Sequence, residues 1–204
     1  AMPGTTLLTP KDIAYRLAKS KARLAIVGAE HADKVDAIRS ECPNLEHLIV
    51  VGGDRANWLS YEHACAQVSE RLSRDDVAPT RADDTMLVYF TSGTTGPPKM
   101  VPLEHSYALA HAITGRYWMD LSEADIHWTL SDTGWAKAAW GTFPPWQMGT
   151  AIVIYDAGAH FDADAHLRLI ARLGVSTFCA PPTAYRLFAQ LDLRDYDLNS
   201  LRHS

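Results

Sequence analysis

The sequence predicts an α/β protein built on a largely parallel sheet. Short apolar runs typical of buried strands alternate along the chain with amphipathic segments of helical period. Glycine and proline fall between these segments, where a strand or helix should end. Strands that alternate with helices build parallel layers, because each helix carries the chain back across one face of the sheet. With 204 residues, 47% of them hydrophobic, the chain is long enough to bury a core.

Capping signals mark helix starts in the first half of the chain. Thr9 precedes Pro10 and Asp12, which gives a threonine cap, a proline at the first helical position and an acid in the first turn. Ser60 can cap a later helix that runs to about Leu72. With the apolar runs, these signals predict the following elements: a helix from 10, a strand at 22–28, a helix at 31–41, a strand at 46–51 and a helix at 61–72.

The second half repeats the alternation after a polar interval. Residues 73–84 lack periodicity, so we expect a linker or subdomain junction there. Asp162 can cap a helix, and Pro181-Pro182 precedes the last one. The predicted elements are strands at 86–90, 126–130, 151–155 and 175–179, and helices at 105–118, 162–173 and 183–191.

Charge and residue spacing exclude several classes of protein. The formal charge is −5 and no long basic run is present, so we expect no nucleic-acid partner. The longest apolar runs fall far short of the roughly 20 residues of a spanning helix, and the first residues lack the pattern of a signal peptide. Three widely spaced cysteines suit a reducing compartment, so we expect a cytoplasmic protein. No Cys-x-x-Cys or His-x-x-x-His pair supports a metal site.

One loop concentrates groups that can bind an anion. It follows the strand at 86–90 and consists of Thr91, Ser92, Gly93, Thr94, Thr95, Gly96, Pro97, Pro98 and Lys99. Four hydroxyls and glycine-freed backbone N–H groups can line one concavity, and Lys99 adds a full positive charge for a polyphosphate. The spacing differs from the Walker pattern, because two prolines separate Gly96 from Lys99. A plain polar surface turn is the competing interpretation.

In this loop the sequence resembles the adenylate-forming superfamily, which contains acyl-CoA synthetases, luciferases and peptide-synthetase adenylation domains. The resemblance implies that Thr91, Ser92, Gly93, Thr94, Thr95, Gly96 and Lys99 bind the β- and γ-phosphates of ATP. Lys99 and the hydroxyls would then stabilise the pyrophosphate leaving group, which gives Lys99 a catalytic role. The chain would be a fragment of the large AMP-binding domain over residues 1–204.

A second stretch resembles the medium-chain acyl-CoA synthetases. It runs Ser131-Asp132-Thr133-Gly134-Trp135, with Ala180-Pro181-Pro182-Thr183-Ala184-Tyr185-Arg186 as further support. The resemblance implies that Trp135 binds substrate, at the point where the acyl group and the pantetheine arm of coenzyme A meet. A large flat ring can wall such an apolar slot, although a buried core tryptophan is the alternative. We interpret Trp140 and Trp146 as packing residues.

The resemblance also implies an activity and its co-substrates. A medium-chain fatty or small aromatic acid would attack the α-phosphorus of ATP, and coenzyme A would then displace AMP from the acyl-adenylate. The main Mg²⁺ ligand, the adenine and ribose contacts and the small C-terminal domain of the family have no counterpart in this chain. We therefore expect the isolated chain to be inactive, and an unpaired sheet edge favours self-association.

Two other functions remain open. The chain could be a non-catalytic remnant that binds a nucleotide or a partner, or it could belong to an enzyme that activates an amino acid for a carrier protein. The flanking coding sequence separates the first alternative from the enzyme, and only the context of Trp135 argues against the second.

Overall fold

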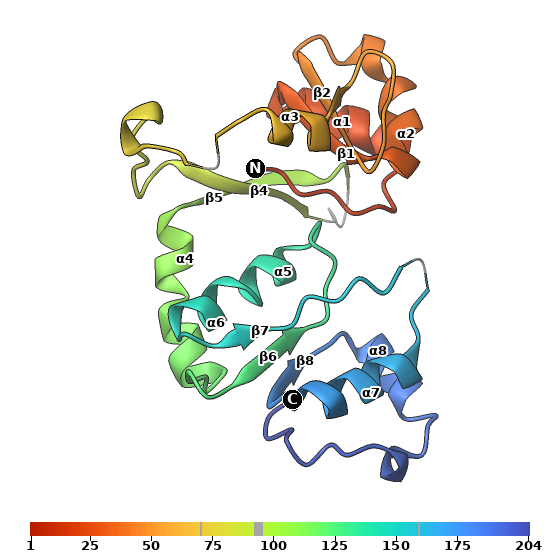
Figure 1. The fold of residues 1–204 in the computed structure, drawn as a ribbon, viewed down its shortest axis with the longest axis vertical. Coiled ribbons are helices and arrows are strands. Elements are labelled where there is room, and N and C mark those ends of the chain that lie inside the picture. Colours follow the sequence, from red (N-terminus) through yellow and green to blue (C-terminus); the bar gives the residue numbers. More distant parts are fainter. Residues whose placement is uncertain (70, 92–95, 159) are drawn as a thin grey trace. The chain divides into compact units, whose positions relative to one another are not determined.

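The computed structural model describes residues 1–69, 71–91, 96–158 and 160–204, and the chain divides into two compact units (Figure 1). Unit 1 consists of Ala1–Pro3, Ala82–Leu87 and Leu103–Ser204. Unit 2 consists of Gly4–Arg81 and Val88–Pro102.

Unit 2 contains a small parallel sheet with helices around it. Its elements are α1 (Pro10–Ser20), β1 (Leu24–Gly28), α2 (Ala32–Asp36), β2 (His47–Val51), β3 (Leu59–Ser60) and α3 (Tyr61–Ala66). The strand order is β1-β2-β3, and both neighbouring pairs are parallel. Leu17 of α1 and Val35 of α2 are buried, as is Val50 of β2, so the core of this unit lies between the helices and one face of the sheet.

A two-stranded ribbon carries the predicted phosphate-binding loop. Its strands are β4 (Thr85–Thr91) and β5 (Lys99–Glu104), which pair with each other. Each strand has residues in both units. The sequence predicted β4 but not β5.

Unit 1 contains a second parallel sheet, in the order β7-β6-β8. Its elements are α4 (Ser106–Ala110), a π-helical turn (Thr114–Trp118), β6 (Ile126–Thr129), α5 (Ala136–Trp140), α6 (Phe143–Gln147), β7 (Ala151–Ile152), α7 (Ala163–Leu173), β8 (Thr177–Cys179) and α8 (Pro182–Phe188). Trp128 pairs with Phe178 in register, and both side chains point to the same face.

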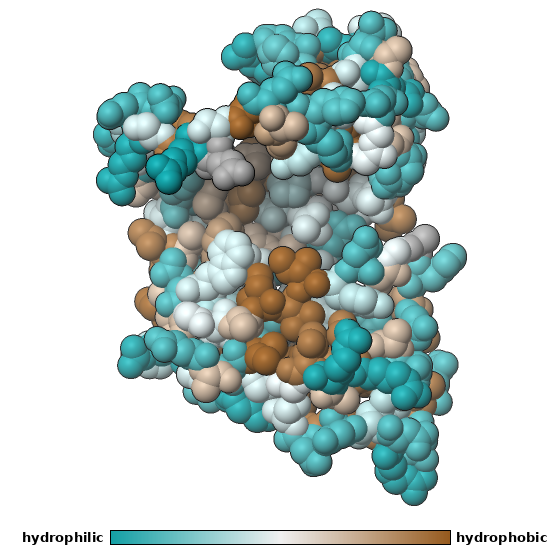
Figure 2. Space-filling model, viewed as in Figure 1, coloured by the Kyte–Doolittle hydropathy of each residue, from teal (hydrophilic) through white to brown (hydrophobic). Residues whose placement is uncertain are grey.

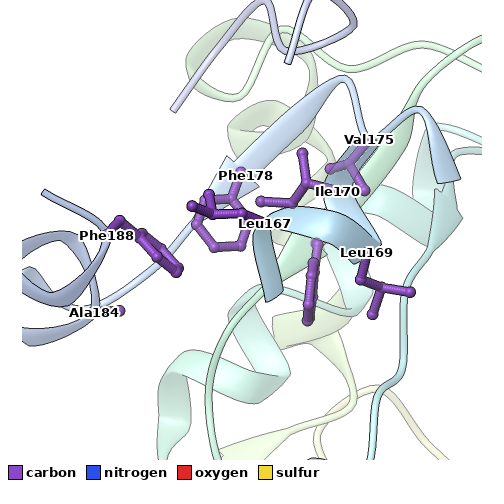
Figure 3. Packing of buried hydrophobic residues seen from close by; sticks show 8 residues of the cluster. Leu167, Leu169, Ile170, Val175, Phe178, Ala184 and Phe188 are labelled. Carbon is purple, nitrogen blue, oxygen red and sulfur yellow. The ribbon is translucent and has the colours of Figure 1, made fainter. Parts of the chain in front are cut away.

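Helices cover both faces of this second sheet. Leu167 and Ile170 of α7, with Phe188 of α8, pack with Trp128 and Phe178 in one buried cluster (Figure 3). The strand residues that alternate with Trp128 and Phe178 point to the opposite face of the sheet. Helices α5 and α6, which follow β6 in the chain, lie on that face. Gly141, which ends α5, lies against Thr129 on that face.

The predicted α/β class with parallel sheets is confirmed, and the main errors concern element lengths. The third helix ends at Ala66 rather than near Leu72. The helix expected at 105–118 is α4 followed by the π-helical turn, and β7 stops at Ile152. The sequence did not predict the short helices α5 and α6, which follow the predicted substrate-binding residue Trp135.

Many large apolar side chains of unit 1 remain exposed. Figure 2 shows a group of apolar side chains on the visible face of this unit. In the whole unit, the large apolar residues that are more than half exposed are Leu109, Ile113, Tyr117, Trp118, Trp135, Trp146 and Ile154. None of the helices in the described part of the chain is long and apolar enough to span a bilayer.

Candidate functional site

The two ends of the predicted phosphate-binding loop lie on paired strands. Thr91 is the last residue of β4, and Lys99 is the first residue of β5. Thr91, Gly96 and Lys99 are exposed to solvent, as a site for a charged ligand requires. Among the described residues, no atom lies within 4 Å of the position that a Cβ at Gly96 would take. Ser92, Gly93, Thr94 and Thr95 lie outside the described residues.

Helix α1 holds both ends of this loop. The hydroxyl of Tyr15 donates a hydrogen bond of 2.9 Å to the carbonyl oxygen of Pro98, next to Lys99. The Tyr15 ring also meets Phe90 edge to face, with ring centroids 6.1 Å apart, and the Arg16 guanidinium lies 5.2 Å from the centre of the same Phe90 ring. The capped helix α1 therefore fixes where the loop leaves β4 and where it enters β5.

The second predicted stretch lies at the carboxyl edge of the sheet in unit 1. After β6 the chain passes to α5 and α6 on one face, and after the neighbouring parallel strand β8 it passes to α8 on the other face. Where the connections of two adjacent parallel strands go to opposite faces, they leave a crevice that binds ligands in open α/β sheets. The topology therefore directs attention to residues 130–135 and 180–182.

Asp132 shapes the turn that presents Trp135. Its carboxylate accepts a hydrogen bond of 2.7 Å from the backbone N–H of Gly134, and its carbonyl oxygen accepts one of 3.1 Å from the N–H of Trp135. Trp135 then starts α5 from an extended conformation. Its side chain is 54% exposed, which excludes the alternative of a core tryptophan in this chain.

A buried polar chain supports the end of β6. His127 is 2% exposed, and its Nδ1 lies 2.8 Å from Oγ1 of Thr177 on β8. Its Nε2 lies 2.7 Å from Oγ1 of Thr129. Burial lowers the pKa of His127 to about 4, so the ring is neutral at pH 7. The sequence did not predict this group, because a lone histidine in an apolar strand carries no signal of its own.

Trp140 and Trp146 differ in how far they are exposed to solvent. Trp140 is half-buried, and its ring meets Trp118 edge to face at 5.1 Å. Trp146 is 59% exposed, so our interpretation of Trp146 as a packing residue is wrong for this chain. Lys99 belongs to unit 2 and Trp135 to unit 1.

These features define an α/β protein with two parallel sheets, an exposed lysine at the start of β5 and an exposed tryptophan between β6 and α5. The family model for the AMP-binding enzymes matches residues 1–204, and the chain belongs to this family. It is 42% identical over 205 residues to the mitochondrial acyl-coenzyme A synthetase ACSM4 of Rattus norvegicus, covering 99% of this chain and 35% of that protein. It is 41% identical over 206 residues to the mitochondrial acyl-coenzyme A synthetase ACSM5 of Homo sapiens, covering 99% of this chain and 34% of that protein.

Solved structures agree with this placement. The anthranilate CoA ligase AuaEII, solved in complex with anthranoyl-AMP, matches with a TM-score of 0.85 and 31% identity, covering 97% of this chain and 38% of that chain. The acyl-CoA synthetase of Brucella canis matches with a TM-score of 0.79 and 26% identity, over 92% and 34% of the two chains. The chain thus spans about a third of the length of its relatives. These curated relatives are described as mitochondrial, and the cytoplasmic location that we expect for this chain stays a prediction.

Proposed function

We propose that this chain forms part of an enzyme that uses ATP to activate a medium-chain fatty or small aromatic acid and transfers the acyl group to coenzyme A. The match of the whole chain to the AMP-binding family carries this proposal. Relatives named acyl-coenzyme A synthetases, at about two-fifths identity, support the acyl-CoA ligase branch. Because the chain spans only about a third of those relatives, the activity is assigned to the longer protein that they represent.

The loop between Thr91 and Lys99 would hold the polyphosphate of ATP. Lys99 is exposed at the start of β5 and can bring its ammonium group to the β- and γ-phosphates. When the carboxylate attacks the α-phosphorus, negative charge builds up on the leaving pyrophosphate. A fixed cation and hydroxyl donors on that side lower the barrier, because they interact more strongly with the transition state than with ATP in its ground state.

Trp135 would supply one wall for the acyl group. This exposed residue is the N-cap of α5, after the carboxyl end of β6, where the topology of open α/β sheets favours a ligand site. An aromatic wall favours an apolar acid and holds its carboxylate end in one orientation. Coenzyme A would approach the same acyl group in the second half-reaction, when its thiolate displaces AMP.

Magnesium is expected together with ATP in this chemistry. In the described ranges, no group of three or more His, Cys, Asp and Glu side chains could hold a metal ion. These residues do not form a protein cage for Mg²⁺, so no step is assigned to a metal bound by them.

ATP titration tests the role of Lys99. We expect weak ATP binding by the 204-residue chain and a roughly tenfold higher Kd for Lys99→Ala, since a charge-assisted contact is worth about 1.4 kcal/mol or more. Lys99→Arg should keep most of the affinity. The matched control is Lys19→Ala, which removes an exposed lysine from α1 of the same unit. Equal loss in both alanine variants would contradict the assignment.

A pyrophosphate-release assay tests whether the isolated 204-residue chain has activity of its own. We expect no measurable acid-dependent turnover from the isolated chain, because it spans only about a third of the length of its relatives. Turnover with octanoate would overturn that expectation. Self-association through an unpaired sheet edge is part of the same proposal, and a monomeric mass by light scattering at high concentration would count against it.

A further inference from the structure

Helix α5 rests on the end of β6 through a glycine. Trp135 precedes the helix at its N-terminus, and Gly141 follows it at its C-terminus. A Cβ atom at Gly141 would lie well inside van der Waals contact with Cβ, Oγ1 and Cγ2 of Thr129. Only a hydrogen atom fits between the backbone of Gly141 and the side chain of Thr129, so any larger residue at 141 must displace the helix or Thr129.

Thr129 cannot easily give way. It is the last residue of β6, which is paired with β8, and its Oγ1 is hydrogen-bonded to Nε2 of His127. His127 is itself bonded through Nδ1 to Thr177 on β8 and is 2% exposed. The side chain below Gly141 is therefore held from two strands, so an added methyl group should move the helix rather than the sheet.

The helix can transmit this displacement to Trp135. Its five residues span only about 8 Å at 1.5 Å per residue. Hydrogen bonds tie both ends, from the N–H of Ala138 to the carbonyl of Trp135 at 2.9 Å and from the N–H of Gly141 to the carbonyl of Lys137 at 2.8 Å. A short hydrogen-bonded turn moves as one body.

We propose that the contact between Gly141 and Thr129 positions Trp135 and thereby sets how bulky an acid the site accepts. This inference rests on the proposed function, in which Trp135 walls the acyl slot. Gly141 and Thr129 are positioning residues that act through α5. Lifting the helix widens the space between the Trp135 ring and the sheet edge, so bulkier acids should gain relative to slim ones.

The position of Trp135 can be followed without a ligand. The chain is labelled with 5-fluorotryptophan, and the fluorine resonance of Trp135 is assigned by its loss in Trp135→Phe. We expect Gly141→Ala to shift this resonance. The double variant Gly141→Ala with Thr129→Gly exchanges the two Cβ atoms and should return the resonance toward its original position, since the collision is removed.

Gly115→Ala is the matched control. A Cβ at Gly115 would lie 2.9 Å from the carbonyl oxygen of Pro144, so this variant also disturbs tight packing in unit 1, but away from Thr129. It should leave the Trp135 resonance in place. If Gly141→Ala does not move the resonance, if Thr129→Gly fails to restore it, or if Gly115→Ala moves it equally, the proposal is wrong.

Titrations with octanoate and 2-naphthoate, in the presence of ATP, give the second readout. Gly141→Ala should change the ratio of the two dissociation constants in favour of 2-naphthoate by about tenfold, the scale of one methylene group in an apolar pocket. Binding with an unchanged ratio overturns the specificity role. If neither acid binds any variant, the acid-binding role proposed for Trp135 fails in this chain, and the resonances alone decide whether Gly141 positions Trp135.

Discussion

Arg202 donates two hydrogen bonds to Asp125, from Nε to Oδ1 and from Nη2 to Oδ2, each 2.9 Å long. Asp125 immediately precedes β6 and is 5% exposed, and it also accepts hydrogen bonds from Ser122 and Ser176. Arg202 also bonds to Asp120, and the neighbouring His203 forms a bridge to Thr177 of β8. The pair thus fastens the last residues of the chain to the sheet of unit 1.

Removing Arg202 should destabilise unit 1. Arg202→Ala leaves the buried carboxylate of Asp125 with only its serine partners, and we expect a loss of about 2 kcal/mol in urea unfolding at pH 7. The figure is below the usual range for a fully buried pair, because the Arg202 side chain is 40% exposed. Arg194→Ala breaks an ion pair with Asp192 that lies at the surface and should change stability by less than about 0.5 kcal/mol. Equal effects would contradict this account.

The same pair predicts a stability loss in acid. Hydrogen bonds from Arg202 outweigh the effect of burial and hold the pKa of Asp125 well below its ordinary value. A carboxyl group with a lowered pKa in the folded state stabilises the protein fully above its unfolded pKa and loses that contribution as the pH falls below about 4. The difference in unfolding free energy between the wild type and Asp125→Asn should therefore be constant from pH 7 to 5 and shrink toward pH 2.

His127 should act in a separate pH window. Burial lowers its pKa to about 4, whereas an unfolded histidine titrates near 6.5. Between these two pH values His127 is protonated in the unfolded chain but not in the folded chain. The free energy of unfolding therefore falls as the pH drops from about 6.5 to about 4, by at most about 3 kcal/mol. His127→Gln should remove this component of the pH dependence. A His127 ring that titrates above pH 6 by NMR would refute the assignment.

The aromatic core of unit 1 predicts a strong effect at Phe178. Its ring lies 5.6 Å from that of Trp128 and 6.0 Å from that of Phe188, and the residue is 3% exposed. Phe178→Ala should cost about 3–5 kcal/mol, and Phe178→Leu, which keeps most of the volume, less than about 1.5 kcal/mol. Tyr117→Ala serves as the control, because Tyr117 is 76% exposed. Chemical denaturation of the three variants measures the order.

Local signals explain which elements could be predicted from the sequence. Thr9 and Asp12 cap the start of α1. Asp162 caps the start of α7, and Gly174, whose φ of 64° suits glycine, follows the last residue of that helix. The strands at the two parallel sheets are short apolar runs between such helices. For these elements the residues that decide the structure are neighbours in the chain.

The remaining features depend on distant residues. Strand β5 contains Pro102 and forms by pairing with β4 across the predicted phosphate-binding loop, a pairing that no periodicity indicates. The sequence does not distinguish Gly141 from other glycines, because its contact with Thr129 depends on the fold. Trp135 could be singled out only by resemblance, and the structure adds that its ring is exposed at a sheet edge. Contacts of this kind become visible only when the fold is known.

The two predicted helix caps of unit 2 differ in the structure, and this difference can be measured. Thr9 and Asp12 form a complete capping box, in which the Thr9 hydroxyl accepts from the N–H of Asp12 and the Asp12 carboxylate accepts from the N–H of Thr9. Ser60 occupies the equivalent position before α3, but its hydroxyl makes no capping bond and lies 3.5 Å from the carboxylate of Glu62.

Thr9→Ala should therefore lower the unfolding free energy of unit 2 by about 1 kcal/mol, the usual cost of losing a side-chain cap. Ser60→Ala should change it by no more than a few tenths of a kcal/mol, because no backbone N–H loses a partner. Thr9→Ser, which keeps the hydroxyl, should restore most of the loss. If Ser60→Ala were as costly as Thr9→Ala, the hydroxyl of Ser60 would have to cap α3 in solution. Helix α1 also holds Pro98 through Tyr15, so Thr9→Ala should increase amide exchange at Lys99 as well, whereas Ser60→Ala should not.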